Sequence, residues 1–104
     1  MKNAIAYIKV LKEKHSKPDL GLDQVAAIHS FALRESFEIF ETFTEKQSGD
    51  ADERSKLYAA IKAAHDAKVP IIVAKLDQLS HDMNVVAGLM GEAIFIVADR
   101  GGVS

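Results

Sequence analysis

Hydrophobic residues along the chain cluster into short runs of strand length. Residues 4–11 and residues 70–74 are almost continuously apolar and rich in β-branched side chains. Residues 93–97 form a third run of the same kind. Such runs are too short for typical helices and are characteristic of strands buried on both faces of a parallel sheet. We therefore predict a strand at each of the three positions.

A fourth strand is predicted over residues 37–44, although its pattern is less regular. Phe37 and Ile39 alternate with polar residues, as expected for a strand with one buried face. Phe40 and Phe43 then break the alternation. The aromatic and β-branched content of the segment nevertheless favours a strand.

Between these strands, apolar residues recur at helical spacing. The pattern predicts helices over residues 23–36, 52–67 and 79–90, with a long polar loop over residues 12–20 and a turn over residues 47–50. The second helix is the best defined, because its apolar side chains fall on one stripe: Leu57, Ala60, Ile61 and Ala64. Strands and helices therefore alternate along the whole chain.

This alternation predicts an α/β fold. Repeated strand-helix-strand units form parallel sheets covered by helices on both faces, so we expect a three-layer α/β/α arrangement with a mostly parallel sheet of about four strands. The chain has 104 residues, which is close to the commonest domain size. Residues 1–104 are therefore predicted to form a single domain.

Composition narrows the chemistry that this domain can perform. The chain has no cysteine, and its four histidines are scattered without metal-ligand spacing, so we expect no metal and no cofactor. No long apolar run or signal-peptide pattern is found, which predicts a cytoplasmic protein without a membrane partner. The 13 basic residues are outnumbered by 15 acidic ones, which argues against strong electrostatic binding to DNA.

Three segments that follow predicted strands carry the most informative motifs. Residues 7–11 read Tyr-Ile-Lys-Val-Leu, and residues 75–81 read Lys-Leu-Asp-Gln-Leu-Ser-His. Between them, Ser48 and Gly49 form a turn that leads to Arg54. In an open parallel sheet, functional groups collect beyond the carboxyl ends of the strands, so these segments are expected to meet there.

In their order and separation, the three segments resemble the catalytic domain of the resolvase/invertase family of serine recombinases. The family pattern is tyrosine-x-arginine-valine-serine, then a serine-glycine turn leading to an arginine, then lysine-leucine-aspartate-arginine-leucine-x-arginine. Residues 20–24, Leu-Gly-Leu-Asp-Gln, resemble the segment with which the family opens its first helix. The resemblance covers nearly the whole chain and implies a resolvase-like fold and a role in site-specific DNA recombination and integration, as in mobile elements.

The resemblance also implies a particular chemistry, from which this chain departs. In the family, the serine attacks a DNA phosphodiester and arginines stabilise the charge on the phosphoryl group. Here the serine position is Leu11 and the neighbouring arginine position is Lys9. The two later arginine positions are Gln78 and His81. We therefore predict a degenerate active site that is catalytically silent, so that the domain is not expected to act as an enzyme.

Other positions keep the family pattern: Gln24, Ser48, Arg54 and Asp77. With its neighbouring arginines replaced, Asp77 is equally well explained as a helix N-cap. Two alternative functions stay open. One is an active recombinase with a rearranged nucleophile, Ser16 or Ser48. The other is a doubly wound module that binds a small ligand or a protein.

The resemblance finally bears on partners. In the family, the catalytic domain leads into a long dimerising helix, followed in many members by a helix-turn-helix domain, and neither is found in these 104 residues. The expected partners are DNA, held weakly at this charge balance, another recombinase subunit, or a second copy of the chain.

Overall fold

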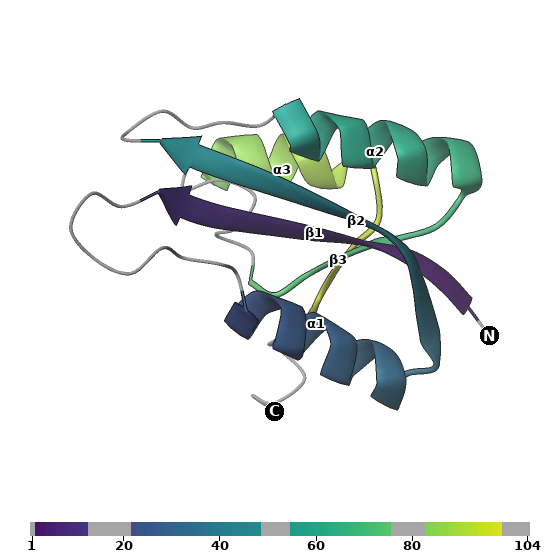
Figure 1. Cartoon of the computed structure of the whole chain (residues 1–104). Coiled ribbons are helices and arrows are strands. Elements are labelled where there is room, and N and C mark those ends of the chain that lie inside the picture. The colour runs from purple at the N-terminus through teal and green to yellow at the C-terminus, as the bar shows by residue number, and fades with distance from the viewer. Residues whose placement is uncertain (1, 13–21, 49–54, 76–82, 99–104) are drawn as a thin grey trace.

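The computed structural model of the chain describes residues 2–12, 22–48, 55–75 and 83–98 (Figure 1). Seven elements alternate between strand and helix along these segments, as the hydrophobic pattern predicts. They are β1 (Lys2–Lys12), α1 (Leu22–Arg34), β2 (Phe37–Ser48), α2 (Ser55–Ala67), β3 (Ile71–Val73), α3 (Met83–Met90) and β4 (Phe95–Val97).

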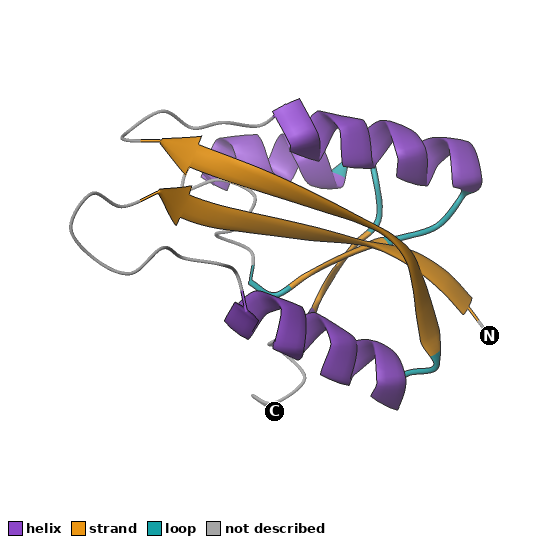
Figure 2. Cartoon of the chain, viewed as in Figure 1, coloured by secondary structure: helices purple, strands orange, loops and turns teal. Residues whose placement is uncertain are grey.

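The four strands form one sheet in the order β2-β1-β3-β4, and every neighbouring pair is parallel. Helix α1 lies on one face of the sheet, and helices α2 and α3 lie on the other (Figures 1 and 2). The predicted three-layer α/β/α fold with a parallel sheet of four strands is thereby confirmed.

Strand β1 is the centre of the core, because its side chains are buried on both faces. Ile5 and Tyr7 pack in the cluster under α2 and α3, together with Leu57 of α2 and Phe95 of β4. The intervening side chains of β1 pack in the cluster under α1, around Ile28. A strand covered on both sides needs an unbroken apolar run, which is the pattern that residues 4–11 carry.

Strand β2 contains a β-bulge that explains its irregular pattern. Ala4 pairs with Ile39 and Ile5 pairs with Glu41, which leaves Phe40 as an extra residue in the ladder. Ile39 packs on the α1 side of the sheet, whereas Phe43 packs on the α2 side. Residues four apart in a regular strand share a face, so the inserted residue switches the two halves of β2 to opposite faces.

Several element ends differ from the sequence prediction. Helix α1 ends at Arg34 rather than at residue 36, because Ser36 has a left-handed backbone with φ of 62°. Strand β2 continues beyond residue 44 to Ser48, where its pairing with β1 ends. The predicted starts of the second and third helices, at residues 52 and 79, lie outside the described residues.

Helix α2 ends in a Schellman motif. The Lys68 N–H donates to the carbonyl of His65 at 3.3 Å, and the Val69 N–H donates to the carbonyl of Ala64 at 3.0 Å. Lys68 adopts the left-handed conformation that the motif requires, with φ of 58°. Val69 and Ala64 also belong to the same apolar cluster. The motif turns the chain from α2 into β3.

In the described part of the chain, no helix is long and apolar enough to cross a bilayer.

Candidate functional site

The carboxyl ends of β1 and β2 bring the first two motif segments together. The two strands are in register, so that Lys9 lies beside Glu45 and Leu11 lies beside Gln47. Ser48 is the last residue of β2 and pairs with the last residue of β1. Lys9 and Glu45 are the two buried charged residues in the described part of the chain, with exposed fractions of 7% and 3%.

The carboxylate of Glu45 accepts hydrogen bonds from two other elements, β1 and the start of α2. The hydroxyl of Tyr7 in β1 donates to Oε1 at 3.3 Å. The N–H groups of Lys56 and Leu57, in the first turn of α2, donate to the same oxygen at 2.9 and 3.1 Å. The hydroxyl of Ser55 donates to Oε2 at 3.2 Å. Glu45 therefore ties β1, β2 and the start of α2 into one buried network.

Physically, Glu45 caps α2 from a distance. The first N–H groups of a helix have no partner within the helix and concentrate the positive end of its dipole. A carboxylate usually reaches them from the adjoining residue, but here it comes from the neighbouring strand, 11 positions away from Lys56. A buried carboxylate is tolerated because several donors replace its lost hydration. The result is a fixed position for the beginning of α2.

Gln24 in the first turn of α1 makes a second long-range contact at the same end of the sheet. Its side-chain oxygen accepts from the Lys9 N–H at 3.0 Å, and its side-chain nitrogen donates to the Lys9 carbonyl at 2.6 Å. The amide thus satisfies both main-chain groups of one residue of β1, as a neighbouring strand would do. This pairing fixes the start of α1 against β1.

Of the predicted site residues, the structure brings Lys9 and Gln24 together through the main chain of Lys9. Leu11 is the last residue but one of β1 and Ser48 is the last residue of β2, so both lie at the same end of the sheet. The remaining predicted positions lie outside the described residues: Ser16, Arg54, Asp77, Gln78 and His81.

Three residues of the site were missed as functional candidates by sequence reasoning: Tyr7, Glu45 and Ser55. Tyr7 stands in the first motif, but its partner could not be known. An acidic residue near the end of a mostly polar strand is normally predicted to be solvent-exposed, so the sequence alone did not indicate that Glu45 is buried. The available clue was the broken alternation at Phe40, which indicates a bulge and therefore a change of face for the residues that follow.

The described residues include no cluster of three or more His, Asp or Glu side chains suited to a metal ion. The groups of the site are instead a buried phenol, a buried carboxylate, a buried lysine and the half-buried carboxamide of Gln24. Such groups can hold the main chain in position and orient polar side chains. The Glu45 carboxylate accepts four hydrogen bonds from other groups of the protein.

Comparison with known proteins gives the fold a family context. The family model "Resolvase, N terminal domain" matches residues 4–94. The C-terminal catalytic domain of ISC1926 TnpA, described as an IS607-like serine recombinase, is similar with a TM-score of 0.67 at 17% identity. That alignment covers 92% of this chain and 67% of the other.

The N-terminal catalytic domain of TP901-1 integrase is similar with a TM-score of 0.70 at 21% identity, over 95% of this chain and 78% of that one. At these identities the structural likeness establishes the fold. No match to the chain was found among curated protein sequences.

Proposed function

The chain belongs to the resolvase N-terminal domain family of serine recombinases, and we propose that this member does not itself cleave or join DNA. Leu11 carries the proposal. Leu11 is the last residue of the Tyr-Ile-Lys-Val-Leu motif, where the family pattern has its nucleophilic serine, and its side chain is a hydrocarbon. Covalent catalysis at a phosphodiester needs an oxygen or sulfur nucleophile, which leucine does not have.

The replaced arginine positions support the same conclusion. A phosphoryl group in transfer is stabilised by cationic groups that match its oxygens, and arginine does so with a planar fork of donors. Lys9 offers a single ammonium group, and Gln78 carries no charge. His81 is at most a single weak cation at neutral pH. Loss of one such donor typically lowers a rate by a factor of about 10² to 10³, and the losses fall at three positions.

In place of cleavage, we propose a role through binding. The domain would associate with an active recombinase subunit, or weakly with DNA, and influence recombination without performing its chemistry. The charge of the chain supports a minor contribution from phosphate contacts, because acidic residues exceed basic ones by two. The Tyr7–Glu45 and Lys9–Gln24 contacts hold the ends of β1, β2 and α1 that carry the motif residues.

The decisive experiment is incubation of the purified chain with supercoiled plasmid and with a suicide oligonucleotide that traps covalent protein-DNA adducts. We expect neither nicking nor an adduct. The variant Leu11→Ser should stay inactive, because the three arginine positions remain Lys9, Gln78 and His81. An active serine recombinase serves as the positive control for both substrates.

Covalent attachment of DNA to the natural chain would refute the proposal. In that case Ser16→Ala and Ser48→Ala separate the two rearranged nucleophiles, because only the variant that lacks the attacking serine loses the adduct. A titration of DNA binding from low to physiological salt measures the phosphate contacts directly, since each contact adds about one unit to the slope of log affinity against log salt.

A further inference from the structure

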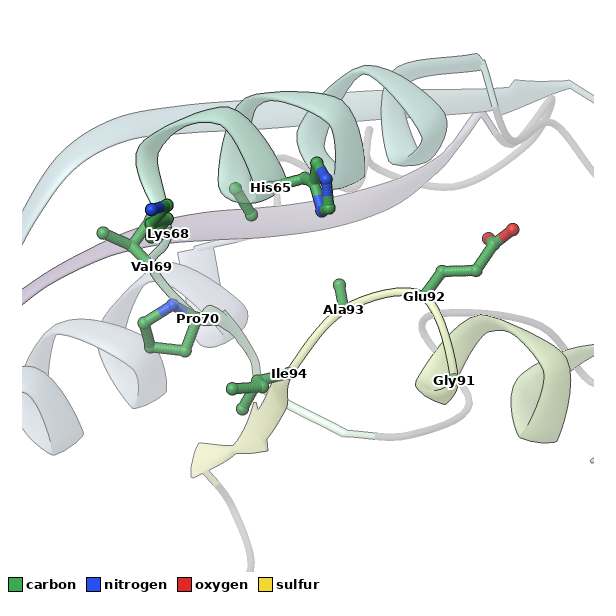
Figure 3. A pocket seen from close by; sticks show the side chains of 9 residues that line it. His65, Lys68, Val69, Pro70, Gly91, Glu92, Ala93 and Ile94 are labelled. Atoms are coloured by element: carbon green, nitrogen blue, oxygen red, sulfur yellow. The ribbon is translucent and has the colours of Figure 1, made fainter.

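A cavity opens at the end of the sheet opposite to the Glu45 network. It lies where α2 leads into β3 and where α3 leads into β4, and its volume is about 480 Å³. Val69, Pro70 and Ala93 supply apolar walls (Figure 3). Val69 and Ala93 also pack against the apolar cluster under α2, so the walls continue into the core. The volume falls within the range of about 300 to 1,000 Å³ that small-molecule sites occupy.

Two charged side chains of opposite sign line this cavity. Lys68 stands on the α2 side and Glu92 on the α3 side (Figure 3). Among the described residues, neither side chain forms an ion pair or a hydrogen bond. Asp66, close to Lys68 in the chain, is by contrast paired with Lys62 at 3.5 Å. The cavity therefore has one unpaired charge of each sign, on opposite walls.

Lys68 occupies a backbone position that favours glycine. It is the left-handed residue of the Schellman motif that ends α2, with φ of 58°. Glycine is the usual residue at this position, because a side chain adds steric strain to the left-handed conformation. A cation at the carboxyl end of a helix offsets part of that strain. What lysine adds here that glycine cannot is an ammonium group beside the cavity.

Glu92 lies where the electrostatics of helix ends disfavour an acid. It follows the last residue of α3 by two positions, and its N–H donates to the carbonyl of Leu89 at 2.9 Å. The carboxyl end of a helix carries partial negative charge, which a cation stabilises and a carboxylate does not. The end of α2 lines the same cavity. A cationic group in the cavity would therefore be attracted by Glu92 and by two helix ends.

The main chain around the cavity leaves recognition to these side chains. Four of the lining N–H groups already donate within the turns that end α2 and α3, namely those of Lys68, Val69, Gly91 and Glu92. Pro70 has no N–H to offer. An anionic group of a ligand would accordingly be bound by the Lys68 ammonium, and a cationic group by the Glu92 carboxylate.

We propose that this cavity binds a short apolar peptide with free ends. The ammonium of the peptide pairs with Glu92, its carboxylate pairs with Lys68, and an apolar side chain covers Ile94, which is 71% exposed. A dipeptide suits the cavity better than a single amino acid, because its two charges lie apart, as those of Lys68 and Glu92 do. The proposal goes beyond the function proposed above and is independent of it, because the cavity lies at the opposite end of the sheet from Leu11.

Titration of the full chain with leucyl-leucine, followed by nuclear magnetic resonance, tests the site. We expect the amide signals of Val69 and of residues 91–94 to shift with a Kd on the order of 1 mM, because an open site engages few groups. The amide of Gln24, at the other end of the sheet, should not shift. Unchanged signals of residues 91–94 at about 20 mM dipeptide, or equal shifts across the whole chain, would overturn the proposal.

Capped peptides and charge variants test the recognition of each end. N-acetyl-leucyl-leucine lacks the ammonium and leucyl-leucinamide lacks the carboxylate, so each should bind at least about threefold more weakly than leucyl-leucine. Glu92→Gln should weaken binding of leucyl-leucine to the same extent and leave the acetylated peptide unaffected. Lys68→Gln should weaken leucyl-leucine and leave the amide unaffected.

Lys46→Gln is the matched control, because it removes an exposed lysine near the end of β2, far from the cavity, and should leave every affinity unchanged. Equal binding of free and capped peptides would show that only apolar contact is involved and would refute the proposed pairing of charges. Weakening by Lys46→Gln as large as that by Lys68→Gln would do the same, since net charge would then account for the effect.

Discussion

Glu45 is a single side chain on which three elements depend. Its carboxylate accepts from Tyr7 of β1 and from the first turn of α2 while it stays 97% buried within the sheet edge. Donors at such a site have no water to replace a missing acceptor. Removal of the carboxylate therefore leaves several buried polar groups unpaired at once, which is more damaging than the loss of any one of the bonds.

We predict that Glu45→Ala lowers the free energy of unfolding by about 2 to 4 kcal/mol, because it strands the N–H groups of α2 and the hydroxyl of Tyr7. Glu45→Gln keeps an acceptor oxygen and should lower it by about 1 kcal/mol. Urea denaturation followed by circular dichroism measures both. Glu41→Ala is the control, since Glu41 is exposed on the same strand. Equal effects of Glu45→Ala and Glu41→Ala would contradict the assigned role.

At this scale, sequence reading located some site residues and missed others for definite reasons. Lys9 and Gln24 were singled out through the family motifs, and the structure brings the two residues into contact. Glu45 was missed because its burial depends on a one-residue insertion five positions earlier, which a regular alternation does not reveal. Tyr7 and Glu45 are 38 positions apart and meet because of the register in which β1 and β2 pair. The sequence around either residue does not reveal this register.

At the scale of elements, the bulge in β2 determines which residues reach the site. The half of β2 before Phe40 packs toward α1, and the half after it packs toward α2. If Phe40 paired with Ile5 in a regular ladder, Phe43 and Glu45 would point toward the α1 face. Glu45 could then reach neither Tyr7 nor the beginning of α2.

Deletion of Phe40 leaves Ile39 beside Ala4 and Glu41 beside Ile5 in a regular ladder, so Phe43 and Glu45 keep their faces and the cost in stability should be only about 1 kcal/mol. Phe40→Ala keeps the insertion and removes a half-exposed ring, so its cost should stay below about 1 kcal/mol. Thermal unfolding of the two variants separates the effect of backbone length from that of the side chain. A deletion variant that loses more than about 4 kcal/mol would contradict the assignment of Phe40 as the extra residue.

The backbone geometry at the end of α1 predicts the direction in which a substitution there changes the free energy of unfolding. Ser36 holds a left-handed backbone that glycine adopts without steric penalty, so Ser36→Gly should raise the free energy of unfolding by about 0.5 kcal/mol. The same change at the exposed Ser30, inside α1, should lower it by about 0.5 kcal/mol. Chemical denaturation of the pair tests the sign. Destabilisation by both substitutions would contradict the helix end assigned at Arg34.

Considered as a whole molecule, the domain is organised around β1. This strand pairs with β2 along its whole length and with β3 over Ile5 and Ala6, and its side chains enter both apolar clusters. Every other described element packs on it directly or through one neighbour. Opening β1 therefore requires the disruption of both layers.

Amide hydrogen exchange should reflect this arrangement. We predict that the amides of Ile5, Ala6 and Tyr7 exchange slowest, near the rate of global unfolding, and that those of β4 at the sheet edge exchange faster. Nuclear magnetic resonance or mass spectrometry after exchange in deuterated buffer measures both. Faster exchange in β1 than in β4 would contradict the prediction that β1 opens only when the apolar clusters on both faces of the sheet are disrupted.

The overall architecture was largely predictable from the sequence, because it follows from the order and spacing of apolar runs. Residues 4–11 and 70–74 carry the continuous hydrophobicity of strands covered on both faces, and the structure places both in the middle of the sheet. What the pattern could not supply was exact element length. Strand β2 extends to Ser48 through polar residues, because its partner β1 continues beside it and not because its own side chains require burial.

The contact between Gln24 and Lys9 has a consequence for how the helical layer can separate from the sheet. Ile5 donates its N–H to Pro70, and Lys9, four residues along the same strand, turns its main-chain groups to the same side. The ladder with β3 spans only Ile5 and Ala6, so the main chain of Lys9 is paired by the side chain of Gln24 in α1. The start of α1 therefore cannot lift away from the sheet without breaking both hydrogen bonds to the central strand.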